Sequence, residues 1–165
     1  MIFVTVGTHE QPFDRLLCEI DRLKENGTIQ EDVVIQSGFS TYEPKFCEWK
    51  KLIPYDEMTA NVKKARIVIT HGGPASFMMA LQEGKIPIVV PRRAEFGEHV
   101  NDHQVDFAEA VAKRYGNIIP VSDIQELGTI LSDYDEIISR MTSEVNSNNA
   151  KFNEALEKIV EDVLK

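Results

Sequence analysis

The sequence predicts a doubly wound α/β fold, in which helices cover both faces of a parallel sheet. Short apolar runs without polar alternation recur along the chain, as is typical of strands that are buried on both faces. Helical segments follow most of these runs, and alternating strands and helices form parallel sheets. The chain has 165 residues, 42% hydrophobic and 27% charged, which suits a single globular domain with one core.

The predicted elements follow one another as strand, loop and helix. Residues 1–7 are apolar or β-branched up to the closing Gly7 and predict a buried strand. An amphipathic helix is expected next, because Phe13, Leu16 and Leu23 recur with other apolar residues at helical spacing. Further strands are expected at residues 33–35, 46–53, 66–70, 86–90 and 117–119, and further helices at 56–65, 74–84 and 101–113. Two more helices are expected after these, separated by residues 146–149.

Composition and charge argue against several classes of function. The formal net charge of -9 disfavours nucleic-acid binding and unaided docking on an anionic membrane. No apolar stretch approaches the ~20 residues that span a bilayer, and the apolar start lacks the basic flank of a signal peptide. We therefore expect a cytoplasmic protein without direct membrane insertion, which reaches the inner face of the membrane through a partner.

Three polar segments are expected at one edge of the sheet. Ligands of open parallel sheets collect outside the carboxyl ends of the strands, and residues 7–11, 70–76 and 92–104 follow predicted strands there. The segment His71-Gly72-Gly73 precedes a helix whose first turn suits Pro74. Backbone N–H groups and the positive end of that helix would face a ligand, and the glycines allow close approach. This arrangement favours a diphosphate.

Other interpretations of these segments remain open. A Gly-Gly turn is often simple punctuation between a strand and a helix. The sequence has neither the dinucleotide-binding glycine pattern nor a phosphate-loop Gly-Lys-Ser/Thr, and Ser76 lacks the flanking glycines of a hydrolase nucleophile, so it is interpreted as a helix cap. All four histidines lie in the three segments, and Glu98, His99 and Asp102 are an alternative metal-binding set. Phosphate and sugar contacts explain the histidines better, so no metal is expected.

Several motifs in fixed order resemble the C-terminal domain of the GT-B glycosyltransferases of family 28. The motifs are Gly7-Thr8-His9, Phe13-Asp14-Arg15-Leu16, Pro54-Tyr55, Thr70-His71-Gly72-Gly73, Gly84-Lys85-Ile86-Pro87, Glu98-His99 and His103-Gln104. The resemblance covers roughly residues 1 to 120. Within this family the chain resembles short bacterial capsule and exopolysaccharide transferase subunits and the catalytic subunit of the eukaryotic two-subunit dolichol-linked UDP-GlcNAc transferase. It implies a Rossmann-like sheet equivalent to the C-terminal half of a GT-B enzyme.

The resemblance also implies roles for individual residues. The Gly7-Thr8-His9 turn would lie beside the donor diphosphate and sugar, and the backbone of Tyr55 would face uracil. The residues expected to close on ribose and phosphate are His71, Gly72, Gly73 and Ser76. His103 and Gln104 would reach the transferred sugar.

Further candidates come from the loop after the fifth strand. The Arg92-Arg93 pair and the loop histidines, including His99, are expected to stabilise charge on the leaving UDP, and a solvated surface pair is the alternative for the two arginines. Glu98 is a further candidate substrate-binding residue. His9 is the tentative general base by its position and near-neutral titration, and a phosphate or sugar contact is an equal alternative for it. One departure concerns the ribose: a related transferase has a glutamate where this chain has Met79, so a backbone group or Glu83 would have to replace it.

The implied reaction is inverting transfer of a hexose from a UDP-sugar to a hydroxyl of a lipid-linked saccharide, in capsule or exopolysaccharide synthesis. Galactose is the first choice of sugar, with GlcNAc and glucuronic acid as alternatives. The UDP-sugar is a substrate, and no cofactor is expected. A non-catalytic UDP-sugar-binding or regulatory module is the main alternative function, and a UDP-sugar epimerase is a weaker one.

A membrane-anchored partner is expected to supply the acceptor site. A GT-B active site lies between two sheet domains, whereas residues 1–165 provide a single donor-binding domain. Residues 148–165 are expected to form an amphipathic helix. Its apolar stripe is Phe152, Leu156, Ile159, Val160 and Val163. This stripe can pack on the partner, on the chain's own sheet, or on both.

Overall fold

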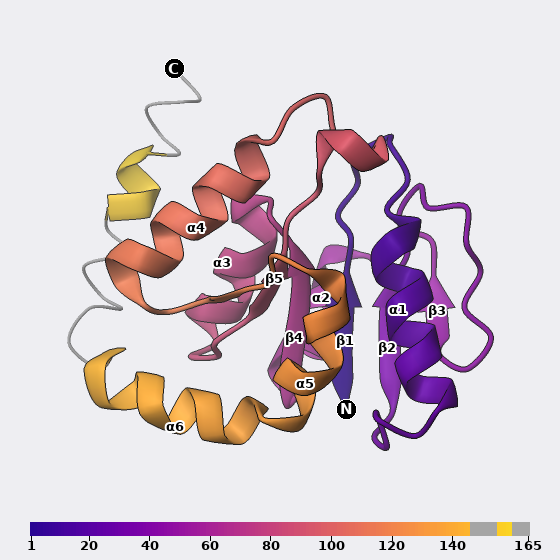
Figure 1. The fold of residues 1–165 in the computed structure, drawn as a ribbon, viewed down its shortest axis with the longest axis horizontal. Helices are drawn as coiled ribbons and strands as arrows, with labels where there is room; N and C mark the ends of the chain where they lie inside the picture. Colours follow the sequence, from indigo (N-terminus) through magenta and orange to yellow (C-terminus); the bar gives the residue numbers. More distant parts are fainter. Residues whose placement is uncertain (146–154, 160–165) are drawn as a thin grey trace.

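The computed structural model describes residues 1–145 and 155–159, and it contains a six-stranded parallel sheet in the order β3-β2-β1-β4-β5-β6 (Figure 1). The strands are β1 (Ile2–Thr5), β2 (Val33–Gln36), β3 (Glu48–Lys50), β4 (Ile67–His71), β5 (Ile88–Val90) and β6 (Ile119–Pro120). The helices are α1 (Asp14–Glu25), α2 (Tyr55–Lys64), α3 (Pro74–Gln82), α4 (His103–Tyr115), α5 (Leu127–Ser132) and α6 (Tyr134–Val145), with 3-10 turns η1 (Ala94–Phe96) and η2 (Ile124–Glu126). The predicted doubly wound α/β fold is confirmed.

The order of the strands reverses at β1. The chain first builds outward from β1 through β2 to β3, and then returns to place β4 on the other side of β1. The register pairs Thr5 with Gln36 on one side and with Thr70 on the other, so β1, β2 and β4 end together. Loops from both halves of the sheet therefore diverge between β1 and β4, which is the place where such sheets bind ligands.

Each face of the sheet has its own core. On one face, α1 and α5 cover the side chains of Val4, Ile69 and their neighbours, and all of these are buried. On the other face, α2, α3 and α4 cover Phe3, Val68 and Val89. Because alternate residues of a strand point to opposite faces, continuous apolar strands supply both cores, and this explains why the strands lack polar alternation.

Several elements differ from the predictions in extent. β1 ends at Thr5 rather than at residue 7, because Gly7 takes a positive φ of 74° and turns the chain out of the sheet. The third strand is only Glu48–Lys50. The helix expected from residue 101 begins at His103, whose backbone N–H donates to Oδ1 of Asn101 at 3.1 Å. Before residue 146 the chain forms two α-helices, α5 and α6, where one was predicted.

The predicted C-terminal helix is described only in part. Residues 155–159 are helical, and Leu156 is 3% exposed and packs in the core formed by α3 and α4, whereas Ile159 is 48% exposed. Phe152, Val160 and Val163 lie outside the described residues. The structure therefore places one member of the apolar stripe inside the domain and leaves another on the surface.

Across residues 1–145 and 155–159, no helix combines the length and the apolar character that a bilayer span requires.

Candidate donor-binding site

The side chain of His71 stands at the centre of the sheet's carboxyl edge. It is the last residue of β4 and is only 9% exposed. Its ring lies between two glycines, since a Cβ at Gly7 would be 2.4 Å from Nε2 and a Cβ at Gly73 would be 2.2 Å from Cε1. The two glycines are therefore required for packing around this imidazole, whatever their role towards a ligand.

The hydrogen bonds of His71 define its tautomer. The backbone N–H of Gly73 donates to Nδ1 at 3.1 Å, so Nδ1 carries no proton. Nε2 is then the protonated nitrogen of the neutral ring, and it lies 3.0 Å from Oγ of Ser76. Burial and the nearby charge of Arg92 lower the pKa of His71 to about 4, so the ring is neutral at physiological pH. Oγ of Ser76 consequently accepts the Nε2–H of His71.

Ser76 does not have the predicted role of a helix cap. The N-cap of α3 is Gly73, which has no side-chain cap bond, and the hydroxyl of Ser76 is turned towards His71 instead. The first turn of α3, with Pro74 as its first residue, lies at the carboxyl edge of the sheet.

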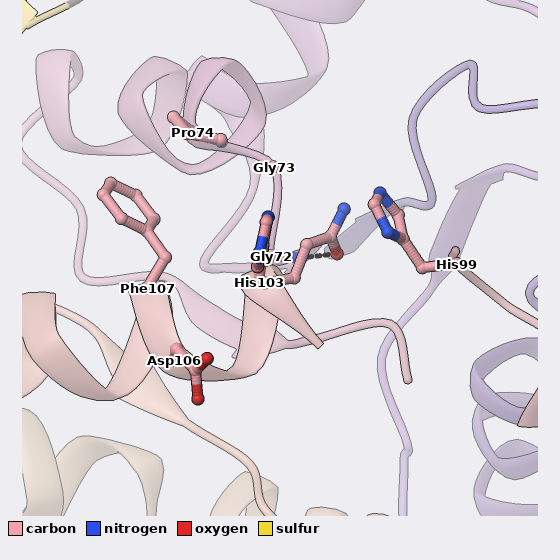
Figure 2. A pocket seen from close by; sticks show the side chains of 8 residues that line it. Gly72, Gly73, Pro74, His99, His103, Asp106 and Phe107 are labelled. Atoms are coloured by element: carbon pink, nitrogen blue, oxygen red, sulfur yellow. Dashed lines mark hydrogen bonds between the residues drawn. The ribbon is translucent and has the colours of Figure 1, made fainter. Parts of the chain in front are cut away.

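Gln104 joins the ends of two strands. Its Oε1 accepts the backbone N–H groups of Gly72 and Arg92, each at 3.1 Å, and the bond to Gly72 is the dashed line in Figure 2. A Cβ at Gly72 would lie 2.8 Å from Cβ of Gln104, so only glycine at position 72 allows α4 to pack this close to the loop after β4. The first turn of α4 is thereby fixed against the loops that follow β4 and β5.

Arg92 is buried and binds backbone carbonyls. It is 0% exposed, and its guanidinium donates to the carbonyl oxygens of Val6 and Gln11, each at 2.7 Å, and of Glu98 at 3.1 Å. It also lies over the ring of Phe13, 4.9 Å from the centroid. Burial lowers the pKa of Arg92 to about 10, which leaves it charged at pH 7. This position differs from the exposed one that direct contact with a leaving UDP requires.

Glu98 is likewise engaged inside the domain. It is 3% exposed, and its carboxylate accepts from Nε of Arg15 at 2.8 Å and from the backbone N–H of Arg93 at 3.0 Å. Arg15 also donates to the carbonyl of Pro91 at 3.0 Å. The pair ties α1 to the loop after β5, so Glu98 holds the shape of the site and does not face a substrate.

His9 and His99 bring two loops together at the mouth of the site. Their ring centroids are 4.8 Å apart with an interplanar angle of 33°. Nδ1 of His9 accepts the backbone N–H of Gln11 at 3.2 Å, and Nδ1 of His99 accepts that of Asn101 at 3.4 Å. Burial, together with the charge of Arg92, lowers the pKa of His9 below its usual value.

A hollow of about 550 Å³ opens beside these residues, between the first turns of α3 and α4. The residues that line it are Gly72, Gly73, Pro74, His99, His103, Gln104, Asp106 and Phe107. Figure 2 shows Phe107 directed towards the side where Pro74 lies, whereas the carboxylate of Asp106 points the other way. The positive ends of two helices and an apolar wall therefore border one space, which suits an anionic ligand with a sugar ring.

A model of the glycosyltransferase family 28 C-terminal domain matches residues 1–162. The chain belongs to this family. Together with the six-stranded parallel sheet, this match supports the predicted family resemblance at the level of the domain. The likeness to capsule subunits and to the dolichol-linked transferase subunit stays a prediction.

Solved glycosyltransferases share the fold. The glycotransferase of kitacinnamycin has a TM-score of 0.57 at 18% identity, and the match covers 86% of this chain and 37% of that one. The calicheamicin glycosyltransferase CalG4 has a TM-score of 0.56 at 17% identity, and the match covers 99% of this chain and 44% of CalG4. The glycosyltransferase SnogD from Streptomyces nogalater has a TM-score of 0.50 at 16% identity, and the match covers 93% of this chain and 43% of SnogD. The chain thus spans less than half of each solved protein. A search of curated proteins gave no match.

Within this family 28 domain, the hollow gathers five of the predicted site residues. They are Gly72, Gly73, His99, His103 and Gln104. Gly7 and His71 lie directly behind them as packing partners. Thr8 is exposed, and Tyr55 begins α2 with its side chain 72% exposed, and neither lines the hollow.

The structure also shows where the residues considered for the ribose and for a metal lie. Glu83 is the C-cap of α3, at the end away from Gly73, and it pairs with Lys63 at 3.8 Å, so it is not placed to bind ribose. Among the residues that the structure describes, no group of three His, Cys, Asp or Glu side chains is arranged to hold a metal ion. The alternative set is dispersed, because Glu98 binds Arg15 and Oδ1 of Asp102 accepts from Ala94.

Four residues of the site were not found from the sequence. Asp106 and Phe107 line the hollow from the first turns of α4, and Arg15 and Phe13 support the loops behind it. The motif Phe13-Asp14-Arg15 was part of the resemblance, but nothing local shows that Arg15 would meet a glutamate 83 positions away. Phe107 lies four residues after His103, a spacing that places both on one side of a helix.

Proposed function

We propose that this chain is the donor-binding subunit of an inverting glycosyltransferase that transfers a hexose from a UDP-sugar to a hydroxyl of a lipid-linked saccharide. Galactose is the first choice of sugar, and capsule or exopolysaccharide synthesis is the proposed process. The observation that carries the proposal is the hollow at the first turns of α3 and α4 in a chain of glycosyltransferase family 28. A membrane-anchored partner supplies the acceptor site and holds the chain at the cytoplasmic face of the membrane.

The polar groups around the hollow suit a nucleoside diphosphate. The first turns of α3 and α4 direct the partial positive charge of their helix ends towards it. Ser76 keeps its O–H for a phosphate or ribose oxygen, since His71 already donates to its Oγ. The guanidinium of Arg92 adds a permanent positive charge behind the loops without touching the ligand. His103 and Gln104, at the start of α4, are proposed to contact the sugar.

The proposed chemistry is a single in-line displacement. The acceptor oxygen forms a bond to the anomeric carbon while the bond from that carbon to the β-phosphate oxygen breaks, and the hydroxyl proton passes to a general base. Negative charge grows on the leaving UDP, and the helix ends with the Arg92 charge stabilise it. We assign the general base to the partner, because the acceptor lies on its side of the cleft.

Transfer measured in the presence of a partner tests the proposal. The chain is co-expressed with a membrane-anchored candidate partner, and transfer of labelled galactose from UDP-galactose to a lipid-linked acceptor is followed. His103→Ala, at an exposed position of the hollow, is expected to abolish transfer with the fold intact. Glu109→Gln, at an exposed position on the same helix outside the hollow, is the matched control. Unchanged transfer with His103→Ala would favour a non-catalytic sugar-nucleotide-binding module instead.

A further inference from the structure

The three histidines behind and beside the hollow share one backbone arrangement. In each of them Nδ1 accepts the N–H of the residue two positions later: Gln11 for His9, Gly73 for His71 and Asn101 for His99. A nitrogen that accepts an N–H cannot carry a proton of its own. All three neutral rings therefore carry their proton on Nε2.

The surroundings of His9 favour its neutral form, because they lower its pKa. Arg92 places a permanent charge near His9, and the two rings would repel each other if both were charged. The negative charge of Glu10 acts to raise the pKa of His9, but its effect is smaller than those that lower it. Glu98 adds little negative charge here because Arg15 neutralises it. His71, also close to the pair, is itself neutral at physiological pH.

Neutral rings in this tautomer offer hydrogen-bond donors and no free lone pair. The Nε2–H of His71 is used by Ser76, whereas no hydrogen bond of Nε2 of His9 or His99 is found in the described part of the chain. Arg92 connects the two loops that carry these rings, because its guanidinium donates hydrogen bonds to the carbonyl oxygens of Gln11 and Glu98. The two donors are thus fixed in place above a buried positive charge.

We propose that His9 and His99 form a pair of neutral N–H donors for the diphosphate of a nucleotide sugar, and that His9 is not the general base of the transfer. This inference rests on the proposed donor-binding function and assigns the chemistry of two residues within it. Arg92 and the helix ends attract the anion electrostatically, and the hydrogen bonds from His9 and His99 orient the bound diphosphate. Binding consequently requires no proton uptake.

Nitrogen NMR of the free chain tests the tautomer. The Nδ1 and Nε2 resonances of a neutral imidazole are distinct, so long-range proton–nitrogen correlation at pH 7.5 shows which nitrogen is protonated. His9 and His99 are expected to show protonated Nε2 and unprotonated Nδ1, and His71 serves as the internal reference for that pattern. Protonated Nδ1 at either residue overturns the proposal.

Calorimetry tests the absence of proton uptake. UDP-galactose is titrated into the chain between pH 7 and 8.5, in pairs of buffers with different ionisation enthalpies. The nucleotide sugar is used because the terminal phosphate of UDP itself gains a proton near pH 6. We expect equal binding heats in the two buffers of each pair, and an affinity constant that changes by no more than about twofold across this pH range. If binding took up a proton, the affinity constant would change by up to about tenfold per pH unit. Uptake of a proton on binding overturns the proposal.

Two substitutions at His9 distinguish a role as hydrogen-bond donor from a role that requires a titratable ring. His9→Asn keeps an oxygen that accepts the N–H of Gln11, as asparagine does in turns, but removes the Nε2 donor. His9→Gln keeps an amide donor that reaches further and cannot titrate. His9→Asn is expected to weaken UDP-galactose binding by about tenfold or more, as for a lost hydrogen bond to a charged group, and His9→Gln by less than about threefold. The same pair at His99 is expected to behave alike.

The outcomes distinguish this inference from the proposed function. Strong UDP-galactose binding that is equally unaffected by both His9 substitutions overturns the donor pair and leaves the donor site standing. His9→Gln that binds normally but fails to transfer with the partner shows that His9 is the base, which overturns the second half of the proposal. No binding of UDP or UDP-galactose by the wild-type chain overturns both the pair and the proposed function.

Discussion

The imidazole of His71 occupies the space that any side chain at Gly7 would need, with Nε2 only 2.4 Å from the position of a Cβ there. Gly7 also has a positive φ of 74°, which non-glycine residues adopt at a cost. The first loop and the end of β4 are therefore fitted to each other through one ring. This contact connects the two halves of the sheet at the point where their loops diverge.

Gly7→Ala is expected to destabilise the protein by about 2–4 kcal/mol, combining the cost of a positive φ with overpacking against His71. Gly84→Ala is the matched control, because Gly84 has a φ of 71° but nothing within 4 Å of its added Cβ. The control should lose only about 1 kcal/mol. Urea unfolding of both variants measures the difference, and equal losses would contradict the packing role of His71.

Asp21 is expected to stabilise the fold in a pH-dependent manner. It is 2% exposed and accepts from the Tyr42 hydroxyl at 2.7 Å and from the backbone N–H groups of Lys45 and Phe46 at 2.9 and 2.8 Å. Burial acts to raise the pKa of Asp21, but these hydrogen bonds outweigh it and the net pKa is lowered. A depressed folded pKa gives stability that is present above the unfolded value of about 4 and is lost as the pH falls through the folded value.

Asp21→Asn should therefore cost about 1–3 kcal/mol at pH 7, and the difference from wild type should shrink below about pH 4. Glu109→Gln, an exposed substitution of the same charge, serves as control. Unfolding by urea at a series of pH values provides the measurement. A difference that is constant from pH 7 down to pH 2.5 would show that the charge of Asp21 is not involved.

The C-terminal segment should divide into a core residue and a surface residue. Leu156→Asp places a charge in the core between α3 and α4 and is expected to cost more than about 2 kcal/mol. Ile159→Asp, at a side chain that is 48% exposed, should leave stability nearly unchanged. If this segment also docks the partner, Ile159→Asp will abolish co-purification and transfer while UDP binding persists. Normal co-purification would place the interface elsewhere.

UDP is expected to stabilise the chain, and ADP much less, because backbone groups at Tyr55 are predicted to bind uracil. Tyr55 begins α2, where the first backbone N–H groups lack partners within the helix. At a concentration 100 times its Kd, UDP should stabilise the protein by about 2.7 kcal/mol. Thermal unfolding with each nucleotide decides this, and equal shifts with both would remove the uracil assignment.

Transfer should be independent of divalent metal ions. Helix ends and the buried charge of Arg92 are proposed to stabilise the leaving diphosphate, which is the role that a metal ion takes in other transferases. Activity of the chain with its partner should be unchanged after treatment with a chelator. Activity that disappears in chelator and returns with manganese would contradict this.

The order of most elements and the meeting of the polar segments at one edge of the sheet could be predicted from the sequence. Continuous apolar runs such as Ile67–Thr70 and Ile86–Val90 are local signals, and parallel strands carry the residues that follow them to the same edge. For this reason Gly72, His99 and His103, which are separated along the chain, were correctly expected together. The number of helices after β6 was not predicted, since short helices there depend on packing more than on local pattern.

The roles of charged residues were decided only by the tertiary structure. The sequence predicted that Arg92 and Glu98 contact the substrate from a polar loop, yet the first is 0% and the second 3% exposed. Burial of a charge requires partners, and these come from distant segments: the carbonyl of Val6 for Arg92, and Arg15 for Glu98. A local pattern cannot specify such partners.

The sequence by itself determined that this chain is a doubly wound α/β domain with a polar edge rich in histidine, because strand, helix and turn preferences act over a few residues. Only the tertiary structure decided what each histidine does there. The proton position of His71 depends on the N–H of Gly73 and on the burial that the loops of β1 and β5 impose. The pairing of His9 with His99 likewise exists because two loops, 90 residues apart, are held by one buried arginine.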